Sequence, residues 1–165
     1  MLKIVISPAK KMNITDEFPC NATVPVFSDR ADVLHGILKN KNIQELKTLW
    51  KCSDKLAEQS YQRLHAFSPD QAVTPALLAY EGIQYQHIAP SVSAASDVYK
   101  RQVPYRLEMQ AKLETAKKND LYEYWSDTLY QSLLAEGMTE LVNLASAEYS
   151  KAILPYKNIR CITCI

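Results

Sequence analysis

The residues with the greatest potential for chemistry lie in the segment 103–151, which combines tyrosine, arginine, lysine and carboxylates at high density. Near its start stand Tyr105, Arg106 and Glu108. An arginine can hold a phosphate or a carboxylate through two parallel hydrogen bonds, and a tyrosine ring can stack on a base or a sugar. If this segment is extended, Arg106 and Glu108 share a face. A structural ion pair between them is then as good an interpretation as a site.

A second polar cluster lies within and after the predicted strand 141–144 and consists of Asn143, Ser146, Glu148, Tyr149 and Lys151. Polar side chains after a buried strand are typical of the wall of a site. Glu108 or Glu148 could act as a general base. A nucleophilic serine needs a positioned base, and none of the three histidines has motif spacing to Ser146. No GxSxG, HExxH or GxGxxG pattern occurs, so no catalytic residue is identified and no cofactor is expected.

Ser7, Lys10 and Lys11 follow the apolar run 2–6, where the chain leaves a predicted strand. Strand ends in α/β sheets often carry ligand sites. Backbone amides after Ser7, together with Lys10, could hold a phosphate, although the glycines of a P-loop are absent. A strand-ending turn with solvated lysines is an equal alternative.

Ser53, Asp54 and Lys55 lie at the junction of two predicted helices. A helix cap formed by Ser53 or Asp54 is the favoured interpretation from these residues alone. In the functional alternative, Lys55 and nearby backbone amides contact a nucleic-acid phosphate, which would position the nucleic acid without reading its sequence. Arg63, two turns further on, would extend the basic face.

The overall composition does not indicate a class of binding partner. A formal net charge of +1 provides no general attraction to nucleic acid or membrane, so any basic surface must be local. The segment 100–118 is such a place, because it holds six basic residues against two glutamates: Lys100, Arg101, Arg106, Lys112, Lys117 and Lys118 against Glu108 and Glu114.

Metal and redox chemistry is not expected. Glu123 and Asp127 would share one helix face, but helical carboxylates are usually solvated and the Glu-x-x-His partners of a di-iron site are missing. Cys161 and Cys164 have CxxC spacing within a predicted strand, which sends residues three apart to opposite faces. Buried, inert thiols are therefore favoured. For the nearby aromatic residues of 122–125, core and rim positions are favoured over a stacking platform.

The hydrophobic pattern predicts an α/β or α+β fold. The run 2–6 predicts a buried central strand. Helices are expected from an N-cap at Ser28 to about Asn40, from about 42, from 53 to 68 (or one long helix over the last two), and after Pro75. If the second and third helices are separate, the residues 52–54 form a tight turn between them. An edge strand is expected over 83–88. A helix is expected from Asp120 to Gly137, with Asp120 as its N-cap and Glu123 as the reciprocal partner in a capping box. A strand over 141–144, a short helix over 145–152 and a strand over 159–165 complete the chain. Together they predict a single domain with a mixed sheet flanked by helices.

No segment approaches the roughly 20 apolar residues of a membrane span, and the N-terminus lacks the apolar core of a signal peptide. We expect a cytoplasmic protein with no membrane partner and no obligate protein partner.

Five motifs, ISPAK, SDKLA, PYRLEM, DLYEYW and LVNLASAEYSK, are similar, in this order, to the YaaA family of bacterial peroxide stress proteins. The resemblance implies a cytoplasmic protein of the oxidative-stress response that limits iron-mediated damage. It also implies a mixed α/β fold, and DNA binding through a basic cleft and an element like a helix-hairpin-helix.

Two stretches depart from the family pattern. The decapeptide 93–102, SAASDVYKRQ, stands where the family carries a helix and a Leu-Tyr-Gly-Leu-Arg-Pro-like stretch, and it resembles a translated sequencing adapter. We expect it to be a non-native insert that replaces a core segment of the family. The family also continues into a basic C-terminal portion, so we expect the chain to be an incomplete YaaA-like domain.

The leading hypothesis is therefore a non-catalytic DNA-binding protein. The predicted DNA- or phosphate-binding residues are Ser7, Lys10, Lys55, Arg63, Tyr105, Arg106, Lys112 and Lys151, and the predicted polar site wall comprises Glu108, Asn143, Ser146 and Glu148. The alternative is an enzyme acting on a nucleotide, a nucleoside or a damaged base, with its site where the ends of strands 2–6 and 141–144 meet.

Overall fold

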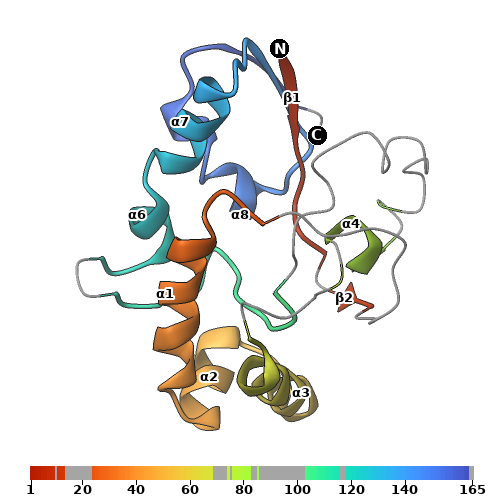
Figure 1. Ribbon diagram of the computed structural model, residues 1–165, viewed down its shortest axis with the longest axis vertical. Coiled ribbons are helices and arrows are strands. Elements are labelled where there is room, and N and C mark those ends of the chain that lie inside the picture. The colour runs from red at the N-terminus through yellow and green to blue at the C-terminus, as the bar shows by residue number, and fades with distance from the viewer. Residues whose placement is uncertain are drawn as a thin grey trace. The chain divides into compact units, whose positions relative to one another are not determined.

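The computed structural model describes residues 1–9, 11–13, 24–68, 74, 76–82, 85, 103–115 and 118–163 (Figure 1). The chain forms two compact units. Unit 1 consists of Met1–Pro8 and Leu107–Ile165, and unit 2 of Ala9–Arg106.

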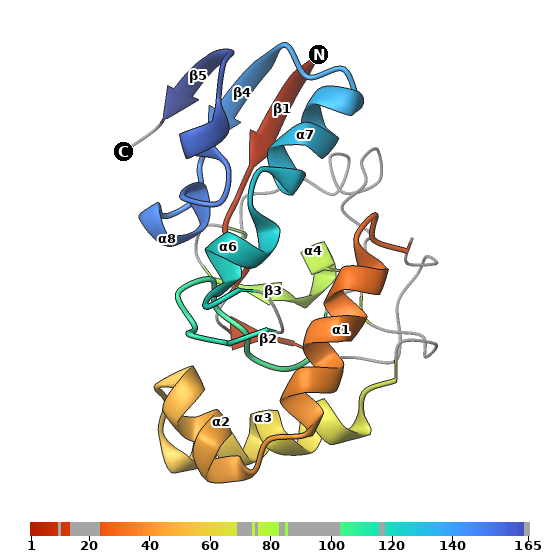
Figure 2. The same cartoon turned by 90° about the vertical axis from the view of Figure 1, so that its left-hand side faces the viewer.

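The centre of unit 1 is a parallel sheet of three strands in the order β1-β4-β5 (Figure 2). These strands are β1 (Leu2–Val5), β4 (Glu140–Asn143) and β5 (Arg160–Thr163). Both neighbours pair with β4, which takes the central position.

The predicted N-terminal strand is present, but the prediction that it is central and buried is wrong. Among the described residues β1 lies at an edge of the sheet, and Leu2 and Ile4 are 51% and 59% exposed. An uninterrupted apolar run is typical of a strand covered on both faces. In the described part of the chain, only the face of β1 that includes Val5 is packed.

Strand alternation determines which residues of this sheet enter the core of unit 1. Leu141 is fully buried with Tyr130 and Met138, and Val5 and Cys161 pack against them. Their alternate neighbours, such as Ile4, project to the opposite face. The core is also held by polar bonds, because the Tyr130 hydroxyl donates to Oδ1 of Asn158 at 2.5 Å and accepts from its backbone N–H at 3.0 Å.

The predicted helix from Asp120 to Gly137 is two helices, α6 (Leu121–Trp125) and α7 (Thr128–Ala135). The helical spacing of leucines continues across the break, but Ser126 adopts a positive φ of 48°, which no α-helix accommodates. The end of α7 follows the prediction. Gly137 has φ of 80° and donates its N–H to the carbonyl of Leu134, as a C-terminal glycine does.

The hydrogen bonds at the start of α6 match the predicted capping pattern in part. Oδ1 of Asp120 accepts from the N–H of Glu123 at 2.8 Å, as predicted. The Glu123 carboxylate accepts instead from the N–H of Asn119 at 3.0 Å, one residue before the expected partner. Unit 1 is completed by α8 (Ala147–Ser150) and the 3₁₀ helix η2 (Leu154–Tyr156).

Unit 2 contains the helices α1 (Ser28–Lys39), α2 (Ile43–Trp50), α3 (Asp54–Ala66) and α4 (Ala76–Ala79). It also has an antiparallel pair, β2 (Lys11–Met12) with β3 (Tyr80–Glu81). Phe27, not Ser28, occupies the N-cap position of α1, so that predicted cap is wrong by one residue. The prediction of two helices separated by a tight turn is confirmed, with the turn at 51–53, one residue before the predicted 52–54. Asn42 and Glu45 form a reciprocal capping box on α2.

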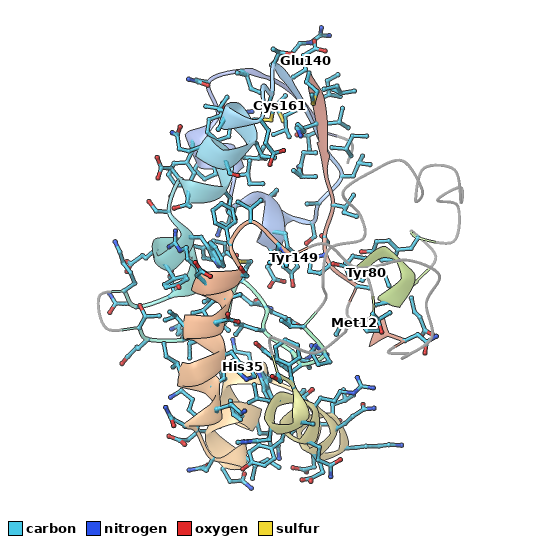
Figure 3. The ribbon with its side chains drawn as sticks, in the orientation of Figure 1. Met12, His35, Tyr80, Glu140, Tyr149 and Cys161 are labelled. Carbon is cyan, nitrogen blue, oxygen red and sulfur yellow. The ribbon has the colours of Figure 1, made fainter. Side chains whose placement is uncertain are left out.

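Helices α1 to α3 bury apolar faces against one another, with Leu38, Leu46 and Leu64 wholly buried. His35 lies on α1 (Figure 3), and its ring contacts those of Phe67 and Tyr105 at centroid distances of 5.2 and 5.3 Å. This aromatic cluster extends the core of unit 2.

The α/β class is thus confirmed. Among the described residues, parallel and antiparallel pairing occur in two separate sheets. The predicted strand over 83–88 and the decapeptide 93–102 fall outside the described residues, apart from Tyr85, and the single-domain organisation stays a prediction. None of the helices in the described part of the chain is long and apolar enough to span a membrane.

Candidate functional site

A pocket of about 360 Å³ lies in unit 1, where the segment 109–112 meets the beginnings of α6 and α8. We name it the Tyr122 pocket, and it is lined by Met109, Gln110, Lys112, Asp120, Tyr122, Ala147, Glu148 and Lys151. A volume of this size falls in the range of small-molecule sites in proteins.

Two hydrogen bonds through Glu148 connect the three segments that form the pocket. The Tyr122 hydroxyl donates to the Glu148 carbonyl oxygen at 2.8 Å. The backbone N–H of Gln110 donates to Oε1 of the Glu148 side chain at 3.3 Å. The side chain of Gln110 in turn donates to Oε2 of Glu108 at 3.2 Å. Glu148 therefore joins α8 to α6 and also to the segment 109–112, which precedes α6 in the sequence.

The pocket combines charged side chains with the aromatic ring of Tyr122. Nζ of Lys151 lies 5.9 Å from the centroid of the Tyr122 ring, at the outer range of a cation–π contact. Lys112 and Lys151 are exposed, and neither forms an ion pair within the described parts of the chain. Burial raises the pKa of the Tyr122 hydroxyl, and the carboxylates of Glu148 and Asp120 raise it further. The pocket thus offers two ammonium groups, two carboxylates and a tyrosine that stays protonated at neutral pH.

The predicted meeting of two strand ends is confirmed. Ser7 follows β1 and Ser146 follows β4, and these strands pair in parallel. The backbone N–H of Ser146 donates to Oγ of Ser7 at 2.8 Å, and the Ser7 hydroxyl donates to Oγ of Ser146 at 3.2 Å. Asn143 is 2% exposed, and its Oδ1 accepts from the N–H of Ala145 at 3.1 Å. These polar atoms hold the turn after β4 in place.

Three residues predicted from the sequence line the Tyr122 pocket. Glu148 is predicted as part of the polar site wall, and Lys112 and Lys151 are predicted to bind phosphate. Glu108 borders it through its bond to Gln110. The structure brings these residues of unit 1 together from segments that are well separated in the sequence.

Four more of the predicted phosphate-binding residues belong to unit 2: Lys55, Arg63, Tyr105 and Arg106. Lys10 lies outside the described residues. Lys55 is exposed in the first turn of α3, and Arg63 is half-buried in its last turn. Arg106 is half-buried at the end of the unit. Tyr105 is only 4% exposed, and burial followed by the nearby Asp32 carboxylate raises its pKa well above the usual value. Its ring is part of the aromatic cluster with His35 and Phe67.

In the turn between α2 and α3, a lysine occupies a position where glycine is usually favoured. Lys51 adopts φ of 47° and ψ of 50°, the left-handed conformation that favours glycine. Lys47 and Asp54 form an ion pair across this turn. Ser53 occupies the N-cap position of α3, but its side chain makes no capping hydrogen bond. The prediction of a side-chain cap by Ser53 is therefore wrong.

The premise for a cation site at Glu123 and Asp127 also fails, because the helix ends at Trp125 and the two residues do not share one helix face. The Glu123 carboxylate accepts from Asn119, and Asp127 accepts from Gln131 at 3.2 Å. No group of three potential metal ligands occurs among the described residues. Cys161 is half-buried in β5, and Cys164 falls outside the described part.

Sequence reasoning missed part of the Tyr122 pocket. Met109, Gln110 and Asp120 were not identified as candidates, and a core or rim position was favoured for Tyr122. The available signal was the position of Tyr122 directly after the Asp120 cap, two residues into a helix, where a side chain lies beside the preceding turn.

Comparison with known proteins gives consistent matches. A family model described as "Peroxide stress protein YaaA" matches residues 2–103 and 99–165. A UPF0246 protein of Ligilactobacillus salivarius is 45% identical over 175 residues, which cover 94% of this chain and 70% of the relative. A UPF0246 protein of Agathobacter rectalis has the same identity and coverage. One of Pediococcus pentosaceus is 39% identical over 186 residues, covering 99% of this chain and 73% of the relative.

The family match extends over most of the chain and includes every segment of the Tyr122 pocket. The relatives are similar at a level that establishes common descent over the same region. The chain therefore belongs to the YaaA family of peroxide stress proteins, whose curated relatives are named UPF0246 proteins.

Proposed function

We propose that this protein acts in the cytoplasm during peroxide stress, where it binds DNA and limits iron-mediated damage. Family membership supports the stress response, and the resemblance to the family supports the DNA and iron components. The observation that carries the DNA component is that Lys112 and Lys151 line the same pocket. These two exposed ammonium groups come from distant segments, line one pocket, and have no ion pair among the described residues.

Lysines without an ion-pair partner at a pocket rim suit phosphate binding, because an ammonium group offers three donors on a flexible stem. Each phosphate that is neutralised releases condensed counterions, so the logarithm of the affinity falls with the logarithm of the salt concentration by about 0.9 per neutralised phosphate on duplex DNA. Lys55 and Arg63 on α3 of unit 2 are separate candidates for phosphate contacts.

The test measures binding of a fluorescent duplex by anisotropy at several salt concentrations. Replacing Lys112 and Lys151 together by alanine should weaken binding and reduce the salt slope, by about one if the two lysines share a phosphate and by about two if each neutralises its own. Lys157→Ala is the matched control, because Lys157 is an exposed lysine of the same unit that does not line the pocket. An unchanged slope in the double variant would remove these lysines from the DNA interface.

Glu148 favours a second candidate function, an enzyme acting on a nucleotide, a nucleoside or a damaged base. Its carboxylate lines the same pocket, and only its Oε1 accepts a hydrogen bond from the described residues. A carboxylate placed in this way could accept a proton from a bound substrate. Incubation with nucleosides, nucleotides and oxidised bases, followed by chromatography, tests for turnover. Product formation that disappears in Glu148→Gln supports the enzyme, and binding without product supports the DNA-binding protein.

We also propose that residues 93–102 are not native to this family. The family match is divided into 2–103 and 99–165, and the two parts overlap at 99–103, around the end of this decapeptide, which supports the proposal. Sequencing the source gene across these codons is the test. A continuous reading frame that encodes SAASDVYKRQ in the genome would contradict it.

A further inference from the structure

The dimensions of the Tyr122 pocket limit what can enter it. Its volume of about 360 Å³ suits a ligand of a few tens of atoms, whereas a DNA duplex is far too wide. If DNA is the partner, as proposed above, the pocket itself can take only one nucleotide at a time. Lys112 and Lys151 could then serve a single phosphate group rather than a stretch of duplex backbone.

We infer that the Tyr122 pocket is a binding site for one nucleoside monophosphate, with its phosphate between Lys112 and Lys151 and its base against Tyr122. This inference rests on the proposed function and names the ligand of the same site. The ligand has two sources, a free nucleotide or an unstacked nucleotide of a DNA strand, and both present the same chemistry to the pocket.

The phosphate end of the site is defined by the two lysines. Lys112 comes from the segment before α6, and Lys151 directly follows α8. Neither ammonium is neutralised by a carboxylate of the described residues, so both remain available to an anion. Lys151 stays near the Tyr122 ring, at 5.9 Å, which keeps its charge at the pocket.

The base end of the site is defined by the Tyr122 ring. The hydroxyl of Tyr122 is fixed by its 2.8 Å hydrogen bond to the Glu148 carbonyl oxygen, so the ring is held in one orientation. Met109 adds apolar surface to the same pocket. Aromatic side chains bind single bases by stacking, and they tolerate different bases because every base has a π face.

The carboxylates set a limit on the charge of the ligand. Asp120 and Glu148 line the pocket with the two lysines, so the four side chains together are neutral. One phosphate is attracted by the lysines, but a di- or triphosphate would bring additional negative charge toward Asp120 and Glu148. The carboxylates can instead accept hydrogen bonds from a sugar hydroxyl or an exocyclic amino group. The pocket should therefore prefer a monophosphate.

The experiment titrates the full chain with deoxynucleoside monophosphates, deoxyribose 5-phosphate, inorganic phosphate and deoxynucleoside triphosphates, using calorimetry. Monophosphates should bind at least about tenfold more tightly than deoxyribose 5-phosphate, because only they supply a base for stacking. They should also bind more tightly than the triphosphates. Equal affinity for monophosphate and inorganic phosphate would overturn the inference.

Variants assign the binding to the pocket. Tyr122→Leu should weaken monophosphate binding about tenfold or more, whereas Tyr122→Phe, which keeps the ring, should change it much less. Tyr156→Leu is the control, since Tyr156 is an exposed tyrosine of the same unit outside the pocket. If circular dichroism shows that Tyr122→Leu does not fold, Lys151→Gln replaces it, and unchanged binding in that variant would overturn the inference.

A second arm distinguishes the two sources of the nucleotide. Tighter binding to a duplex with a mismatch than to a fully paired one, with competition by free monophosphate, identifies an unstacked nucleotide of DNA as the ligand. Monophosphate binding without this preference identifies the free nucleotide. Salt-dependent duplex binding without any monophosphate binding would overturn the pocket inference and leave the proposed DNA binding intact.

Discussion

The hydroxyl of Tyr122 donates a 2.8 Å hydrogen bond to the backbone carbonyl oxygen of Glu148, which connects α6 with α8. The partners are 26 residues apart in the sequence, and each contributes a side chain to the same pocket. The bond therefore has a structural role and also fixes the aromatic wall of the candidate site.

Removing this hydroxyl should destabilise the protein without removing the ring. Tyr122→Phe is expected to lower the free energy of unfolding by about 1 kcal/mol, the usual net value of one hydrogen bond. Urea denaturation followed by circular dichroism measures the change. Tyr156→Phe alters an exposed tyrosine of the same unit and should have an effect near zero. Equal losses in the two variants would mean that the bond contributes nothing to stability.

The lysine in the turn between α2 and α3 is expected to reduce stability. Lys51 has φ of 47°, a conformation that costs a residue with a Cβ roughly 1 kcal/mol more than glycine. Lys51→Gly should raise the free energy of unfolding by up to about 0.5 kcal/mol, after the extra chain entropy of glycine is subtracted. Lys51→Ala retains the Cβ and should be close to neutral. A destabilised glycine variant would show that the lysine side chain stabilises the turn.

His35 should make stability depend on pH. It is buried, and neither ring nitrogen has a hydrogen-bond partner among the described residues. Burial lowers its pKa below 6.5, the charge of Lys39 and the nearby His65 lower it further, and Asp32 opposes them. Below pH 6.5 the unfolded chain therefore binds a proton that the folded chain does not, so stability should fall as the pH decreases from 6.5 toward the lowered pKa.

The test compares urea denaturation of the wild type and His35→Phe between about pH 5 and 8, the range in which histidines titrate. The phenylalanine variant should lose part of the decline below pH 6.5, because it removes the titrating ring while it retains aromatic packing in the cluster. His65→Gln controls for an exposed histidine of the same unit. Identical pH profiles for the wild type and His35→Phe would contradict a buried neutral histidine.

Two serines at the ends of β1 and β4 should contribute unequally to stability. Ser7 accepts from the N–H of Ser146 at 2.8 Å, whereas the bond between the two hydroxyls is longer, at 3.2 Å. Ser7→Ala removes both bonds and should cost about 1 kcal/mol, and Ser146→Ala removes only the longer one and should cost less. Thermal denaturation of the two variants gives the comparison. The reverse order would indicate that the hydroxyl pair is the stronger link.

Local patterns in the sequence predicted most of the elements, because capping and hydrophobic periodicity act over only a few residues. Asp120 and Gly137 mark the beginning and end of a helical segment as expected. The α2–α3 pair and the strands β1, β4 and β5 also lie where the pattern predicted them. The motifs identified the family, since their order along the chain is itself sequence information.

Tertiary structure decided what these patterns leave open. The break at Ser126 and the central position of β4 depend on the packing of distant segments, which apolar periodicity does not encode. The same holds for the Tyr122 pocket. The residue types around it signalled phosphate chemistry, but only the packing of α6, α8 and the segment 109–112 placed Lys112, Glu148 and Lys151 in one pocket with Tyr122. The sequence thus determined the family, the elements and most of the reactive groups, and the fold selected which of those groups share a site.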